Sequence, residues 1–206
     1  MSDLTIFIVS SKYRLYVDQL TTEVIRKSIH MLVALVPLLA AWNLGLTTTV
    51  LMIGIVVYTY SEFLRQQGYE VALISRLTSA AARKRDSGKF VLGPVTLGLG
   101  ALLALALYPS PAAAIAIYAL AFGDGLSSLA GRMFGSVIIP FTKGKSVEGS
   151  LTCFLAVLTA AYAMGFDPLK AILLAAAATV LEVLPTKDFD NILLPLGVGA
   201  LALFLL

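Results

Sequence analysis

Four clusters of polar and ionisable residues stand out because each lies within, or at the end of, a long apolar segment. The clusters occupy residues 23–30, 123–135, 143–150 and 182–191. An ionisable group inside a membrane helix is costly unless it is paired, protonated or bound to an ion. Each cluster is therefore a candidate functional site.

The first cluster places Glu23, Arg26, Lys27 and His30 at positions i, i+3, i+4 and i+7. Residues with this spacing share one face of a helix. Lys27 and His30 are candidate catalytic side chains. The alternative is a basic stop at the membrane entry, with a local Glu23–Lys27 pair and an Arg26 side chain that extends to the interface.

The second cluster is centred on Asp124, which is flanked by two glycines. If its apolar segment is helical, Asp124 lies about 15 Å from the end of that segment. A carboxylate at that depth must be paired, protonated or bound to a cation. Ser127, Gly131 and Gly135 form a stripe of small residues that lets a helix or ligand approach the backbone. Alternatively, the stripe only packs helices and Asp124 pairs with Arg132.

The third cluster combines Lys143, Gly144 and Lys145 with Ser146, a potential helix N-cap. Ammonium groups and free backbone N–H groups therefore converge where a helix begins, which suits phosphate binding. The spacing differs from that of a Walker P-loop. The alternative is simple helix capping, with Glu148 placed favourably in the first turn.

The fourth cluster supplies oxygen atoms of the kind that bind Mg²⁺ together with phosphates, from Glu182, Asp188, Asp190 and Asn191. Taken alone, it could be a solvated acidic loop. Taken with the other clusters, it places carboxylates from separate helices and lysines at one membrane face. That combination is what metal-assisted chemistry on a nucleotide phosphate requires.

The composition indicates what must position these residues. The chain has 206 residues, of which 59% are hydrophobic and 13% charged, and its mean hydropathy is +0.91. Soluble domains have about 25% charged residues, so we expect an integral membrane protein. The single cysteine, Cys153, excludes an internal disulfide and a cysteine-based metal site. We expect no cleaved signal peptide in the first 30 residues.

The apolar segments predict an all-α, polytopic membrane protein with about seven transmembrane helices in a single domain, residues 1–206. Spanning helices need about 20 apolar residues, and breaks at 42–45, 108–111 and 165–168 divide the apolar runs. The last segment has only 15 residues, which is below the usual spanning length. The expected spans lie near 25–42, 46–63, 90–108, 112–134, 148–165, 169–184 and 192–206.

Charge supports this topology. With seven spans, the segments 1–24, 64–89, 135–147 and 185–191 lie on one side, which then carries 14 of the 15 Lys and Arg residues. The positive-inside rule makes that side cytoplasmic and places the N-terminus there. Of the 12 acidic residues, 11 also lie on or toward this side, which indicates a polar site that faces the cytosol.

The segment 64–89 predicts an amphipathic interfacial helix. Its apolar residues Val71, Ile74, Leu77 and Ala81 have helical spacing, and basic residues lie among them. The alternative is a solvated loop whose basic run, residues 83–85, only fixes the topology.

The four clusters together resemble the polyprenol kinase family, which includes dolichol kinase, phytol kinase and the CTP-dependent diacylglycerol kinase of fungi. The resemblance covers most of the chain, and it implies a multi-pass kinase that uses CTP and a divalent metal such as Mg²⁺ to phosphorylate a lipid alcohol. The matching elements, in chain order, are Arg26-Lys27-Ser28-Ile29-His30, Gly123-Asp124-Gly125, Ala130-Gly131 with Gly135, Lys145-Ser146-Val147-Glu148-Gly149-Ser150, and Glu182 with Asp190-Asn191 and Pro195.

Roles for the site residues follow as expectations. Asp124, Glu148 and Asp190, with Glu182 and Asn191, would bind Mg²⁺ directly or through water. The expected catalytic residues are Asp124, His30 and Lys27, with Asp124 or His30 as the base that takes the hydroxyl proton. The expected nucleotide-binding and phosphate-binding residues are Lys143, Gly144, Lys145, Ser146, Gly131 and Arg132.

The expected partners are CTP, the bilayer and an isoprenoid alcohol such as dolichol, phytol or geranylgeraniol, with no nucleic acid. A phosphatidate cytidylyltransferase remains an alternative because it shares a Gly-Asp motif and uses CTP and metal. A CDP-alcohol phosphotransferase is excluded because Asp124-Gly125 is followed by Ser128 and Leu129 where Ala-Arg is expected. A small transporter is the other alternative, although its polar groups would lie near the midplane with access to both sides.

Overall fold

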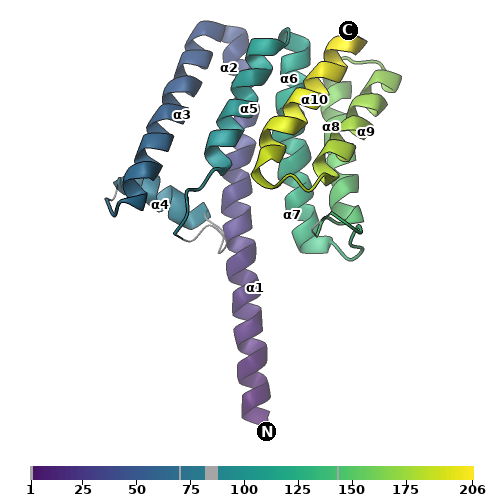
Figure 1. Ribbon diagram of the computed structural model, residues 1–206. Helices are drawn as coiled ribbons and strands as arrows, with labels where there is room; N and C mark the ends of the chain where they lie inside the picture. Colours follow the sequence, from purple (N-terminus) through teal and green to yellow (C-terminus); the bar gives the residue numbers. More distant parts are fainter. Residues whose placement is uncertain (1, 70, 82–87, 143) are drawn as a thin grey trace.

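The computed structural model is all-helical, as predicted, and describes residues 2–69, 71–81, 88–142 and 144–206. Helices account for 83% of the residues. The described part of the chain contains no strand longer than an isolated antiparallel bridge between Ile138 and Ser146. Figure 1 shows a bundle of helices from which the N-terminal part of α1 projects.

The described part of the chain is built of successive helices. They are α1 (Ser2–Met31), η1 (Leu32–Leu35), α2 (Val36–Trp42), α3 (Leu44–Gln66), α4 (Ala72–Ala81), α5 (Gly93–Leu107), α6 (Ser110–Tyr118), the π-helical segment η3 (Ala119–Asp124), α7 (Gly125–Phe134), α8 (Val147–Ala163), α9 (Pro168–Val183), η4 (Lys187–Phe189) and α10 (Asp190–Leu205).

The three predicted breaks are confirmed, and local capping explains two of them. The Asn43 side chain accepts a hydrogen bond from the Leu46 backbone N–H at 2.9 Å and caps α3. Pro109 separates α5 from α6. The Asp167 carboxylate caps α9 by accepting from the Leu169 backbone N–H at 3.0 Å. Side-chain oxygens at these N-caps satisfy backbone donors that the helix leaves free.

The continuous helix formed by α6, η3 and α7 is the centre of the bundle. In an apolar stretch of 18 residues within this helix, 67% of the residues are buried, whereas the corresponding share in α3 is 11%. It packs against α1, α8, α9 and α10, and α3 lies at the outer edge against α5. Large apolar side chains such as Leu38, Val56 and Phe204 are exposed on the outside, as expected for a bundle that faces lipid.

Four helical stretches among the described residues are long and apolar enough to cross a membrane. α5, α8 and α9 have 15, 17 and 16 residues, which is below the usual spanning length of about 20. The helical content of the predicted spans is therefore confirmed, but their number, about seven, is not. The four stretches are Val17–Trp42, Leu44–Gln66, Ser110–Phe134 and Lys187–Leu205.

The predicted interfacial helix is shorter than the segment 64–89. The helix α4 covers only Ala72–Ala81, and it lies beside α1 and α3. The basic run 83–85 lies outside the described residues. The α3–α4, α7–α8 and α9–α10 connections all lie toward the end of the bundle from which α1 projects (Figure 1), which agrees with the predicted grouping of these segments.

This grouping predicts which sites are accessible from the same side of a membrane. In a Cys153→Ala background, we expect single cysteines at the exposed positions Gln67 and Ser136 to react with a membrane-impermeant maleimide from one side. Cysteines at Ser110 and Asp167, at the other end of the bundle, should react only from the opposite side. Reaction of Gln67→Cys and Ser136→Cys from different sides would contradict the topology.

Candidate active site

A buried ion pair joins the first helix to the centre of the bundle. The Lys27 Nζ donates to the Asp124 Oδ2, and the two residues are only 1% and 3% exposed. The two alternative pairings that the sequence suggested, Asp124 with Arg132 and Glu23 with Lys27, are therefore wrong. Asp124 does not pair with Arg132, which is exposed at the end of α7, and Glu23 pairs with Arg26 at 2.5 Å instead of with Lys27.

His30 lies one turn beyond Lys27 and contacts the same central helix. Its Nε2 lies 2.8 Å from the Leu120 carbonyl oxygen and 3.4 Å from the Asp124 Oδ2. A carbonyl oxygen only accepts hydrogen bonds, so Nε2 carries a proton, and in the neutral ring the lone pair is on Nδ1. Leu120 and Asp124 belong to the π-helical segment η3, a type of irregularity that is frequent at functional sites.

A second ion pair lies beside Ser127, one turn beyond Asp124 on the central helix. The Lys145 Nζ donates to the Glu182 Oε1, and the Ser127 hydroxyl donates to the same oxygen at 3.1 Å. The Glu182 Oε2 is buried and has no hydrogen-bond partner among the described residues. Burial opposes the charge of Lys145, but the nearby Asp124 and Glu182 carboxylates raise the pKa of its ammonium above the ordinary value. Lys145 is therefore charged at neutral pH.

The two pairs belong to one cluster of alternating charges. Asp190, at the start of α10, interacts electrostatically with Asp124, Lys27 and Lys145. We call these residues, with His30 and Glu182, the polar cluster. The sequence predicted that its members lie near one another, and the structure brings them together from α1, η3, the α7–α8 connection, α9 and α10.

Small residues bring α7 and α8 close enough for Lys145 to reach the cluster. A Cβ atom added to Gly149 would lie 2.8 Å from the Ser127 carbonyl oxygen, and one added to Gly135 would lie 2.9 Å from the Ser146 Cβ. The Ser146 hydroxyl accepts from the Gly149 backbone N–H at 3.1 Å, so Ser146 is the predicted N-cap. The stripe of small residues therefore packs two helices together.

Three other predicted site residues lie outside these contacts. The Glu148 carboxylate accepts from the backbone N–H groups of Ser136 and Val137, at 2.8 and 3.2 Å, so it stabilises the loop before α8. The Asn191 amide donates to the Thr96 hydroxyl at 2.9 Å and ties α10 to α5. Gly144 has a φ of +101°, which favours glycine. Lys143 lies outside the described residues.

The described residues contain no group of three or more His, Cys, Asp and Glu side chains that could hold a metal ion. Mg²⁺ commonly binds through one or two carboxylates, with water and phosphate oxygens as its other ligands. The unpaired Glu182 oxygen fits such a partial site, because Lys145 interacts electrostatically with Glu182 and also with Asp124 and Asp190.

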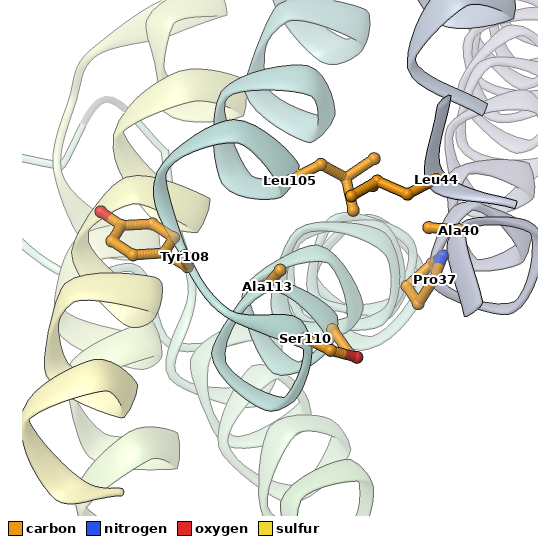
Figure 2. A pocket seen from close by; sticks show the side chains of 8 residues that line it. Pro37, Ala40, Leu44, Leu105, Tyr108, Ser110 and Ala113 are labelled. Atoms are coloured by element: carbon orange, nitrogen blue, oxygen red, sulfur yellow. The ribbon is translucent and has the colours of Figure 1, made fainter. Parts of the chain in front are cut away.

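A cavity beside the polar cluster was not predicted. It has a volume of about 350 Å³ and lies between α1, α3, α4 and α5, with His30 and Asn191 in its wall. The only signal in the sequence was the amphipathic spacing within 64–89. A second cavity, of about 100 Å³, lies near the α2–α3 and α5–α6 junctions (Figure 2). In Figure 2 the Tyr108 ring is directed toward α10, where its hydroxyl donates to the Leu196 carbonyl oxygen at 2.7 Å.

The buried ion pair gives a prediction about stability. Lys27→Met or Asp124→Asn alone leaves the other charge buried and unpaired, which should destabilise the protein by about 3–5 kcal/mol. The double variant removes both charges, so its loss should be clearly smaller than the sum of the single losses. Thermal unfolding in detergent measures this, and additive single effects would contradict a direct pair.

The close helix approach gives a second prediction. Gly149→Ala should destabilise the bundle because the new Cβ would lie 2.8 Å from a backbone oxygen. Gly54→Ala on α3 is the matched control, since a Cβ there meets no atom within 4 Å, and helix propensity favours alanine by up to about 1 kcal/mol. Unfolding midpoints should move in opposite directions, and equal shifts would contradict the packing argument.

The chain was compared with protein-family models, solved structures and curated proteins. No family model matches it, and no solved structure matches it significantly. A "Probable phytol kinase, chloroplastic" of Triticum aestivum is 28% identical over 200 residues, which cover 87% of this chain and 66% of the relative. The "Phytol kinase 1, chloroplastic" of Arabidopsis thaliana is 28% identical, covering 84% of this chain and 63% of the relative.

A bacterial relative gives the same result. The "Phytol kinase" of Synechocystis sp. is 29% identical over 189 residues, which cover 87% of this chain and 78% of the relative. The chain thus spans slightly less than two thirds of the plant relatives described above. The matched part includes most of this chain in all three comparisons. The chain is similar in sequence to phytol kinases over most of its length, which confirms the predicted resemblance to the polyprenol kinase family.

Proposed function

We propose that the chain is a CTP-dependent lipid-alcohol kinase. It would transfer the γ-phosphate of CTP to a polyprenol-type alcohol, such as phytol, geranylgeraniol or dolichol, at the cytoplasmic face of a membrane. The observation that carries the proposal is the polar cluster itself, in which buried cations and carboxylates from five parts of the chain meet beside an apolar cavity. The similarity to phytol kinases supports the same activity.

The cations of the cluster suit the charge of a nucleotide triphosphate. Lys145 would bind the β- and γ-phosphates, together with Lys143, which precedes it in the sequence motif but lies outside the described residues. Lys145 is only partly buried, with 26% of its side chain exposed, so a phosphate can reach it. The Ser146 and Gly149 start of α8 is adjacent, where helix N–H groups favour anions. Phosphoryl transfer depends mainly on such positioning and charge neutralisation.

Mg²⁺ would be held by one or two of the carboxylates of Asp124, Glu182 and Asp190, with the remaining ligands from water and phosphate. It would neutralise the triphosphate charge as the β–γ bond breaks. Support comes from the buried, unpaired Glu182 oxygen and from Lys145, which interacts electrostatically with all three carboxylates. Glu148 and Asn191 are already engaged by backbone and side-chain partners and would support the site from outside.

The reaction requires one proton transfer. The alcohol oxygen attacks the γ-phosphorus, the bond from the γ-phosphorus to the β–γ bridging oxygen breaks, and CDP leaves. The hydroxyl proton would go to His30 Nδ1 or to Asp124. His30 is suited because its Nε2–H donates to the Leu120 carbonyl oxygen, which leaves the lone pair of the neutral ring on Nδ1. Lys27 would hold Asp124 in position and balance its charge.

The proposal predicts a labelled product and a required carboxylate. Purified protein given CTP labelled at the γ-phosphate, Mg²⁺ and phytol or geranylgeraniol should release a labelled lipid monophosphate. Asp124→Asn should lower the rate by about 100-fold to 1,000-fold. The substitution removes the negative charge that pairs with Lys27 and that is proposed to bind Mg²⁺. Asp18→Asn, an exposed position on α1, is the matched control. Full activity in folded Asp124→Asn would contradict the assigned role.

Product analysis separates the competing functions. A CDP-lipid with release of pyrophosphate would indicate a cytidylyltransferase. No lipid product from any nucleoside triphosphate, combined with solute uptake into proteoliposomes, would indicate a transporter. A preference for diacylglycerol over the isoprenoid alcohols would change the acceptor and leave the kinase chemistry in place.

A further inference from the structure

We propose that the cavity between α1, α4 and α5 binds the apolar chain of the acceptor, with its hydroxyl end toward His30. This inference rests on the proposed function, because it assigns the binding site of the second substrate. The cavity is lined mostly by aliphatic side chains, and its polar lining includes Arg26, His30, Asp188 and Asn191. An apolar chamber with a few polar groups at one part of its wall matches an alcohol with a long hydrocarbon chain.

The amphipathic helix α4 forms one wall of this cavity. Ile74, Leu77, Thr78 and Ala81, at positions i, i+3, i+4 and i+7, all line it. The apolar stripe that the sequence assigned to the membrane interface therefore faces the space between α4 and α1. The exposed Arg76 lies on a different face of α4. This arrangement explains why a short amphipathic helix follows α3 in a bundle of apolar helices.

Two lining residues have buried polar atoms without partners. The Thr78 Oγ1 and the Arg26 Nε are buried and make no hydrogen bond within the described residues, and Thr78 as a whole is only 6% exposed. An unmade hydrogen bond at a buried polar atom costs about 1–3 kcal/mol. A bound alcohol can both donate and accept, so it can satisfy such groups.

His30 connects the cavity to the polar cluster. It lines the cavity, and its Nε2 contacts Leu120 and Asp124 on the central helix. The imidazole therefore lies between the chamber for the chain and the carboxylate and ammonium groups proposed to bind the triphosphate. A hydroxyl at this boundary can meet a γ-phosphate without the hydrocarbon entering the polar cluster.

The size and position of the two cavities favour this one. Small-molecule pockets usually have about 300–1,000 Å³, and the α1–α4–α5 cavity, at about 350 Å³, is at the low end of that range. It can hold the first part of a long chain, and the rest would extend between the helices into lipid. The second cavity has about 100 Å³ and no ionisable lining group except Tyr108, whose hydroxyl is already bonded to Leu196.

Photocrosslinking tests the location without requiring turnover. The full chain in detergent with CTP omitted is irradiated with an isoprenoid alcohol that carries a diazirine near its hydroxyl end, and the labelled peptides are identified by mass spectrometry. We expect label in the peptides of α1, α4 and α5, and loss of that label with excess unlabelled phytol. Label confined to the exposed face of α3, or label that phytol does not reduce, would overturn the proposal.

A matched pair of cavity variants tests the same site by kinetics. Ala81→Phe fills the α1–α4–α5 cavity, and Ala40→Phe makes the same change in the second cavity. Ala81→Phe should raise the KM for the alcohol about tenfold or more, with the KM for CTP unchanged and with the unfolding midpoint retained. Ala40→Phe should leave both constants unchanged. Equal effects of the two variants, or an effect of Ala81→Phe on CTP alone, would overturn the proposal.

The unpaired hydroxyl gives a variant that distinguishes binding from stability. Thr78→Val keeps the shape and removes an unsatisfied group, so it should not lower the unfolding midpoint. It should weaken phytol competition in the crosslinking assay by about tenfold. Thr59→Val on the exposed face of α3, whose hydroxyl bonds only within its own helix, is the control. Unchanged competition by Thr78→Val would remove Thr78 from the site and contradict the proposed hydroxyl-end placement.

The two proposals can fail separately. Competed label in the cavity peptides without any lipid phosphate product would contradict the kinase proposal and retain an isoprenoid-binding site. A lipid phosphate product without label in the cavity would retain the kinase and overturn this binding site.

Discussion

The rest of the site depends on the pairing of Lys27 with Asp124. Two charges this deeply buried persist only if each satisfies the other, because a single buried charge loses its solvation without compensation. The pair fixes the rotation of α1 against the central helix, and this rotation places His30, one turn later, against Leu120 and Asp124. Arg26, one residue earlier, then faces Glu23 and the cavity. One ion pair thus determines which α1 side chains lie at the polar cluster and which line the cavity.

The second constraint is the close approach of α7 and α8. The Lys145 side chain reaches Glu182 because Gly131, Gly135 and Gly149 place no Cβ atoms of their own between these helices. Ser127 donates to Glu182 from the same face of α7. The glycines carry no functional group, but they set the distance between α7 and α8. This distance allows Lys145 to contact the polar cluster.

The sequence predicted the helices and the members of the cluster better than it predicted their partners. Helix ends followed from local chemistry, such as the Asn43 and Ser146 caps, which spacing reveals. The sequence did not reveal the partner of Asp124, because Lys27 lies 97 residues away in the chain. Spacing along one helix indicates only local partners such as Arg132. The π-helical segment η3 was equally hidden, since α6 is apolar on all sides and has no periodicity to interrupt. The cavity required four separate elements to be placed in space.

The position of His30 bears on a problem that any such kinase must solve. Water competes with an alcohol for a reactive phosphate, so the phosphate must meet the hydroxyl where water is excluded. Lys27, His30 and Asp124 are each less than 4% exposed, whereas Lys145 is partly exposed. A triphosphate can therefore approach from the water side at Lys145, while a hydroxyl approaches from the apolar cavity at His30. In the proposed kinase, the reacting groups would meet at the buried end of each path, and the bundle would separate the two substrates by polarity.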